Sequence, residues 1–110
     1  MADFDFSKQV DLSLLGLRDA LIKAEESADF EVEESGGAIH ISFDDPPGRF
    51  VISPNSAVRQ VWISALSTSF KLDWSAERND FVLVKTGEAL KPLVARLINQ
   101  QMGDEAVSLG

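Results

Sequence analysis

The spacing of apolar residues changes twice along this chain, and that change limits the possible folds more than any other feature of the sequence. Between Val10 and Ala24, apolar side chains recur at the spacing of an amphipathic helix. From residue 29 onward apolar and polar residues alternate, which indicates strands with one buried face. Helical spacing returns from Leu90 to Leu97. The expected order is a helix, a series of strands and a second helix.

Turn residues divide the middle of the chain into about six strands. Glycine supplies the left-handed backbone of tight turns and proline lacks the N–H that a sheet needs, so SGG (35–37) and DDPPGR (44–49) separate the first three strands. The final helix is expected to begin near Thr86, and residues 103–110 are expected to form a loose tail. The strands that we expect are DFEVEE (29–34), AIHISF (38–43), RFVIS (49–53), RQVWISAL (59–66), FKLDWS (70–75) and FVLVK (81–85).

Two helices from opposite ends of a chain can cover one face of a single antiparallel sheet. We therefore predict an α+β fold, a two-layer α/β sandwich in which the N- and C-terminal helices pack on one face of a sheet of about six strands. A length of 110 residues suits one domain, so residues 1–110 are expected to fold as a single domain. The other sheet face must then meet solvent or a partner.

Composition excludes several classes of function. The chain has 18 acidic and 10 basic residues and a net charge of −8, so it would repel nucleic acid. It contains no cysteine, which excludes disulfides, thiolate metal sites and cysteine nucleophiles. No apolar run approaches the roughly 20 residues of a membrane helix, and the first residues carry no secretory signal. We expect a cytoplasmic monomer in a bacterium, or a mitochondrial matrix protein if the chain is a processed eukaryotic one.

The segment DFEVEESGG (29–37) concentrates negative charge on one face of a strand. Asp29, Glu31 and Glu33 alternate with the apolar Phe30 and Val32. Carboxylates on one strand face lie roughly 6.6 Å apart, which suits weakly held, bridged or water-shared cations and not a closed cage. The charges could equally serve to keep an edge strand from pairing with another sheet. Both interpretations stay open on residue pattern alone.

A tryptophan is expected on the open sheet face. If Val61 and Ile63 are buried, alternation places Gln60, Trp62 and Ser64 on the opposite face. Trp62 then either closes a sheet edge or anchors a partner. Alternation in FKLDWS (70–75) sends Trp74 to the core and leaves Lys71 and Asp73 to flank Trp62. The single histidine, His40, is expected on the polar side of its strand, as a surface residue or as one metal ligand.

The succession of a helix, an acidic strand, a GG hairpin, QVWIS (60–64), DW (73–74) and TGEAL (86–90) resembles the frataxin family, whose bacterial members are called CyaY. The resemblance covers nearly the whole chain. It implies a two-layer sandwich that binds Fe²⁺ and Fe³⁺ weakly through acidic residues of the first helix and first strand. It also implies a role in iron–sulfur cluster assembly, by docking on the cysteine desulfurase and its scaffold protein. Iron is the only cofactor expected, with neither haem nor a bound cluster.

The resemblance also implies which residues carry these roles. The expected metal-binding residues are Asp19, Glu25, Glu26, Asp29, Glu31 and Glu33. The expected partner-binding residues are Gln60, Trp62, Ser64, Lys71 and Asp73.

Arg18, Ile22 and Lys23 interrupt the acidic side of the helix, which lowers the iron capacity that we expect. We expect a regulator or adaptor and not an enzyme. The alternatives are a metal-independent acidic interaction module of the same complex, and iron storage with ferroxidase activity.

Overall fold

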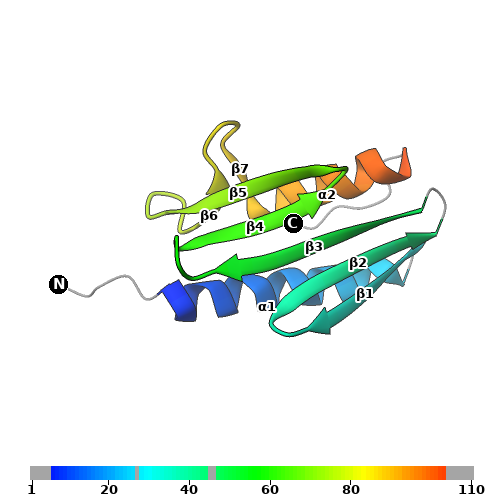
Figure 1. The fold of residues 1–110 in the computed structure, drawn as a ribbon, viewed down its shortest axis with the longest axis horizontal. Coiled ribbons are helices and arrows are strands. Elements are labelled where there is room, and N and C mark those ends of the chain that lie inside the picture. The colour runs from blue at the N-terminus through cyan, green and yellow to red at the C-terminus, as the bar shows by residue number, and fades with distance from the viewer. Residues whose placement is uncertain (1–5, 27, 45–46, 104–110) are drawn as a thin grey trace.

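The computed structural model describes residues 6–26, 28–44 and 47–103 and shows two helices packed on a single antiparallel sheet. Both helices lie on one face of the sheet, so the predicted two-layer sandwich is confirmed (Figure 1). The sheet has seven strands where about six were expected, and neighbours in sequence are neighbours in the sheet. The elements are α1 (Phe6–Glu25), β1 (Phe30–Ser35), β2 (Ala38–Asp44), β3 (Pro47–Asn55), β4 (Gln60–Ala65), β5 (Thr68–Ser75), β6 (Asp80–Leu83), β7 (Glu88–Ala89) and α2 (Leu90–Met102).

The core lies between the helices and the sheet, and its members follow from the two periodicities of the sequence. Helical spacing places Val10, Leu14, Leu17 and Leu21 on the buried side of α1. In β2 and β4 every second residue is buried, as in the iBiBiBe pattern along β2. Each fully buried aliphatic or phenylalanine side chain contributes about 1.5–3 kcal/mol relative to an exposed one. In the described part of the chain no polar or charged residue is buried.

The first hairpin has the turn that its sequence predicts. Gly36 and Gly37 have φ angles of 59° and 81°, in the left-handed region that glycine enters without steric cost. This two-residue turn fixes the register, so that Ser35 pairs with Ala38 and Phe30 with Phe43. Phe30 and Phe43 are both buried, so the register brings the apolar faces of the two strands together.

The segment before α2 differs from the expectation. The helix begins at Leu90 and not near Thr86, because Glu88 and Ala89 form the short strand β7 beside β6. Pro92 falls in the first turn of α2, where a residue without an N–H is tolerated. The helix ends at Met102 and Gly103 follows it as the C-cap, so the expected loose tail, apart from Gly103, lies outside the described residues.

Strand β3 is longer than the predicted 49–53 and contains Pro54. Pro54 pairs with Val61 of β4, whereas pairing with β2 ends at Ile52. Beyond Ile52 the strand therefore has one neighbour instead of two, and a missing N–H can be accommodated there.

The sheet face opposite the helices has no layer of the described chain packed on it. Strand β1 is one edge of this sheet, and α1 contacts it from the helix side. In the described part of the chain, neither helix combines the length and apolarity needed to cross a bilayer.

Candidate functional site

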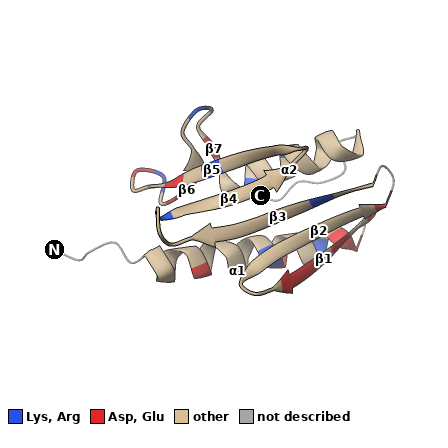
Figure 2. Ribbon diagram, viewed as in Figure 1, with Lys and Arg blue, Asp and Glu red and all other residues tan. Residues whose placement is uncertain are grey.

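The predicted metal-binding residues lie around strand β1 but on two different sides of it. Figure 2 shows acidic residues gathered at β1 and at the neighbouring end of α1. Because Phe30 is buried and Val32 packs against the core, the alternating Glu31 and Glu33 face away from the helices. Asp19, Glu25 and Glu26 belong to α1 or directly follow it.

We call the first group the open-face acids, which are Asp29, Glu31, Glu33 and Asp44. The second group, the helix-side acids, consists of Asp19, Glu25, Glu26 and Glu34. Asp44 and Glu34 were not among the residues predicted from the sequence.

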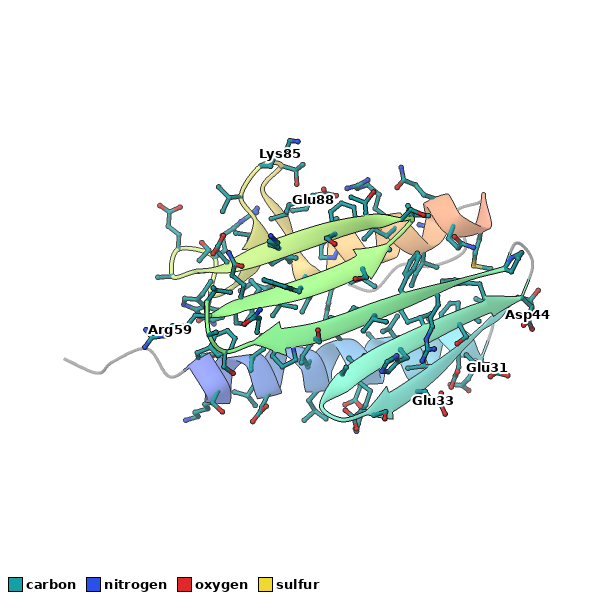
Figure 3. The ribbon with its side chains drawn as sticks, in the orientation of Figure 1. Glu31, Glu33, Asp44, Arg59, Lys85 and Glu88 are labelled. Atoms are coloured by element: carbon teal, nitrogen blue, oxygen red, sulfur yellow. The ribbon has the colours of Figure 1, made fainter. Side chains whose placement is uncertain are left out.

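Asp44 joins the open-face acids through the register of the first hairpin. Phe30 pairs with Phe43. Continuing this register by one residue away from the turn places Asp29 opposite Asp44. Asp29, Glu31 and Asp44 line, together with Ser42, an open hollow of about 460 Å³. In Figure 3 the labelled Glu31, Glu33 and Asp44 lie at the same end of the molecule. Counting back from the GG turn would have revealed this pairing in the sequence.

Glu34 joins the helix-side acids through a contact with Arg18. Arg18 Nη1 lies 3.4 Å from Glu34 Oε1, and Arg18 Nη2 lies 3.1 Å from Asp19 Oδ1. The guanidinium hydrogen bond to Asp19, and to a smaller extent the charge of Glu34, raise the pKa of Arg18 above its ordinary value. Arg18 therefore remains a cation and neutralises part of the helix-side group.

Glu25 has a role in holding the fold. Its Oε2 accepts a hydrogen bond of 2.9 Å from the backbone N–H of Val32. Because β1 is an edge strand, this N–H would otherwise have no partner in the sheet. A carboxylate that is already bonded to the backbone has less freedom to move toward a metal ion.

The acidic residues form no closed metal cage in the described part of the chain. Within residues 6–26, 28–44 and 47–103, no three histidine, aspartate or glutamate side chains converge closely enough to hold a metal ion. Open-face carboxylates two residues apart on β1 are separated by roughly 6.6 Å of strand, so a cation there would be bridged or would keep much of its water.

His40 lies opposite Glu33 in the hairpin but is bonded to a different neighbour. Its Nδ1 is 3.0 Å from Arg49 Nη2. A guanidinium only donates hydrogen bonds, so Nδ1 acts as the acceptor in this contact and is directed toward β3.

The predicted partner-binding residues form a second surface, the tryptophan patch: Gln60, Trp62, Ser64, Lys71 and Asp73. Its position follows from the pairing of β4 with β5, in which Trp62 lies opposite Lys71 and Gln60 opposite Asp73. Trp62 is 36% exposed, whereas Trp74 packs against Phe81 with ring centroids 5.2 Å apart.

A chain of side-chain contacts orients Trp62. Its Nε1–H donates to Gln60 Oε1 over 2.8 Å, and Gln60 Nε2 donates to Asp73 Oδ1 over 3.0 Å. Lys71 Nζ lies 5.0 Å from the centre of the indole ring, a cation–π distance. The indole N–H is therefore satisfied within the patch, and the ring remains available for contact with another molecule.

The fold defines a class of protein, the two-layer α/β sandwich with one uncovered sheet face, and comparisons with known proteins agree with this fold. A family model described as a frataxin-like domain matches residues 1–104. The iron-sulfur cluster assembly protein CyaY of Thioalkalivibrio sulfidiphilus is 24% identical over 104 residues, covering 94% of this chain and 96% of that protein. The protein of the same name from Stutzerimonas stutzeri is 32% identical over 81 residues, covering 74% of this chain and 72% of that protein.

A solved structure shows the same fold. Frataxin from Psychromonas ingrahamii matches with a TM-score of 0.72 at 18% sequence identity, and the match covers 97% of this chain and 99% of that one. Because the family model spans nearly the full length, this chain belongs to the frataxin family.

Proposed function

We propose that this protein is a regulator or adaptor of iron–sulfur cluster assembly and not an enzyme. In this proposal the open-face acids meet iron and a basic protein surface, while the tryptophan patch docks on a cysteine desulfurase and its scaffold protein. The observation that carries the proposal is that both surfaces occupy the one sheet face that the helices leave uncovered. The relatives' names, iron-sulfur cluster assembly protein, supply the biochemical setting.

Iron is supported by the chemistry of the open-face acids. Carboxylate oxygens accept Fe²⁺ and Fe³⁺, and a cation relieves the mutual repulsion of Asp29, Glu31 and Asp44 around their shared hollow. With only oxygen ligands and no closed cage, binding is weak, exchangeable and sensitive to salt. Such an ion can be passed on, which a tightly held one cannot.

Docking is supported by the fixed geometry of the tryptophan patch. Tryptophan is enriched among residues that dominate binding energy at interfaces. The contacts of Gln60 and Lys71 with Trp62 already restrict the rotamers of the indole ring before a partner binds. Less side-chain freedom is then lost on binding, which lowers the entropic cost of association. The open-face acids on the same sheet face would steer a basic partner toward this patch.

A second candidate function, docking without metal, is supported by the helix-side acids. Arg18 already neutralises Asp19 and Glu34, and Glu25 is bonded to the backbone of β1. In this version the helix-side acids are used within the fold, the open-face acids serve the basic partner, and none of the acids serves iron.

An anaerobic titration with Fe²⁺, followed through backbone amide signals, separates the two functions. We expect broadening confined to residues 29–33 and around Asp44, and its loss in the double variant Glu31→Lys/Glu33→Lys. The variant Asp11→Lys/Glu77→Lys changes the net charge by the same amount at exposed positions of α1 and the β5–β6 turn, and should keep the broadening. If the wild-type signals stay unchanged with Fe²⁺ while desulfurase binding depends on Glu31 and Glu33, the metal-independent function is the correct one.

A further inference from the structure

Arg18 is the one basic residue of the described chain whose side chain is recorded within ion-pair distance of two acids from different elements, Asp19 on α1 and Glu34 on β1. We infer that Arg18 is a built-in counter-cation that hinders Asp19 and Glu34 from binding cations and so directs cations toward the open-face acids. The inference rests on the proposed function, because it specifies which side of β1 serves as the cation surface.

The surroundings of Arg18 hold it in this position. Its side chain is 32% exposed, whereas the side chains of Asp19 and Glu34 are 63% and 50% exposed. Its Nε is shielded from solvent and has no hydrogen-bond partner in the described structure, so the stem of the side chain is covered while the terminal nitrogens reach the acids. The guanidinium therefore lies between α1 and β1, within contact distance of an acid from each element.

A metal ion near Asp19 and Glu34 would either displace the Arg18 guanidinium or be repelled by it. At Asp19 and Glu34 a cation would compete with Arg18, and a divalent ion beside a guanidinium is repelled. The exposed Lys23 in the last turn of α1 adds a further positive charge on the same helix. No basic side chain is recorded in ion-pair contact with Asp29, Glu31, Glu33 or Asp44, and none of these four is bonded through its side chain in the described structure.

As a consequence, cations are directed to one side of β1. Of the acids on β1 and its hairpin partner, those without a recorded basic partner lie on the sheet face that also carries the tryptophan patch, whereas Glu34 on the helix side is paired with Arg18. Iron and the docking surface would then face the same partner, although α1 and β1 both carry acids.

The test compares site-resolved Fe²⁺ binding in three variants of the full chain. Arg18→Gln removes the charge, Arg18→Lys keeps a charge without the forked guanidinium, and Lys85→Gln removes one charge elsewhere. Figure 3 shows Lys85 on the β6–β7 loop at the opposite side of the molecule from Glu31 and Glu33. Anaerobic Fe²⁺ alone is the probe, and amide broadening is followed separately at residues 29–33 and at Asp19 and Glu34.

In the wild type and in Lys85→Gln we expect broadening on the open face and little at Asp19 and Glu34. In Arg18→Gln a second set of broadened signals should appear at Asp19 and Glu34, with affinity there about tenfold higher than in the wild type. Arg18→Lys should stay close to the wild type. Thermal unfolding should change little, because exposed ion pairs contribute roughly 0–1 kcal/mol.

The two proposals fail at different residues. Absence of broadening at 29–33 in the wild type contradicts the proposed iron site, whatever happens at Asp19 and Glu34. The counter-cation inference is overturned if Arg18→Gln gains nothing at Asp19 and Glu34, if Lys85→Gln gains as much, or if the wild type already binds Fe²⁺ there as strongly as on the open face.

Discussion

At the scale of single residues, the acids near β1 differ in what they already do in the folded chain. Glu25 accepts the N–H of Val32, and Glu34 is paired with Arg18. Glu31 and Glu33 are exposed on the other side of the strand. Residue type alone does not distinguish these roles, because a carboxylate that holds an edge strand and one that meets a cation have the same chemistry.

The structural role of Glu25 can be measured directly. Glu25→Ala should lower the free energy of unfolding by about 1–2 kcal/mol, since it leaves the edge N–H of Val32 without its acceptor. Glu25→Gln keeps an acceptor oxygen and should lose less than half of that amount. Urea unfolding of both variants gives the comparison, and equal losses for Ala and Gln would show that the hydrogen bond does not stabilise β1.

At the scale of elements, most of the fold follows from periodicity, and the exceptions have physical reasons. Alternation is enough to predict that Val61 and Ile63 are buried while Trp62 is exposed, and the structure agrees. The two-residue strand β7 is too short to carry any period, so the start of α2 was placed four residues too early, at Thr86 instead of Leu90. Pro54 lies just beyond the predicted third strand (49–53), yet it belongs to β3. The pairing of β3 with β2 ends at Ile52, so a residue without an N–H is tolerated at position 54.

An ion pair closes the junction between β7 and α2 and gives stability a pH dependence. Arg96 Nε and Nη2 bond Glu88 Oε2 and Oε1 over 2.6 and 2.9 Å. The hydrogen bond from Arg96 lowers the pKa of Glu88 below its ordinary value. A carboxyl whose pKa is lowered on folding stabilises the folded state above its unfolded pKa, roughly 4.3, and that stabilisation is lost as the pH falls through the lower folded value.

Arg96→Gln should therefore destabilise the protein at pH 7 by up to about 1 kcal/mol, a figure kept small because the Arg96 side chain is 42% exposed. The difference between wild type and variant should shrink below pH 4 and vanish once Glu88 is protonated in both states. Urea unfolding across pH 3 to 7 measures it. A difference that stays constant over this range would mean that Arg96 acts through packing and not through Glu88.

At the scale of the whole molecule, the sheet face that the helices leave uncovered unites the two surfaces. The sequence alone predicted that Gln60, Trp62 and Lys71 would lie together, since pairing and alternation decide it. It did not separate Glu31 from Asp19, although burial of Phe30 implies that Glu31 faces away from the helices. The contact of Arg18 with Glu34 depends on how α1 docks against β1, and no local pattern encodes that.

The central claim is that this open face lets the protein act on cluster assembly. The most direct test is the rate of cluster formation by a cysteine desulfurase and its scaffold protein, with and without this protein. The account predicts that the wild-type protein changes this rate and that Glu31→Lys/Glu33→Lys abolishes the change. The Trp62→Ala variant should reach the same change only at a protein concentration at least about tenfold higher than the wild type requires. Both variants should keep the wild-type thermal midpoint to within a few degrees. Two results would contradict the account. One is a rate of cluster formation that is the same with and without the wild-type protein. The other is that both variants, although folded, change this rate as strongly as the wild type does.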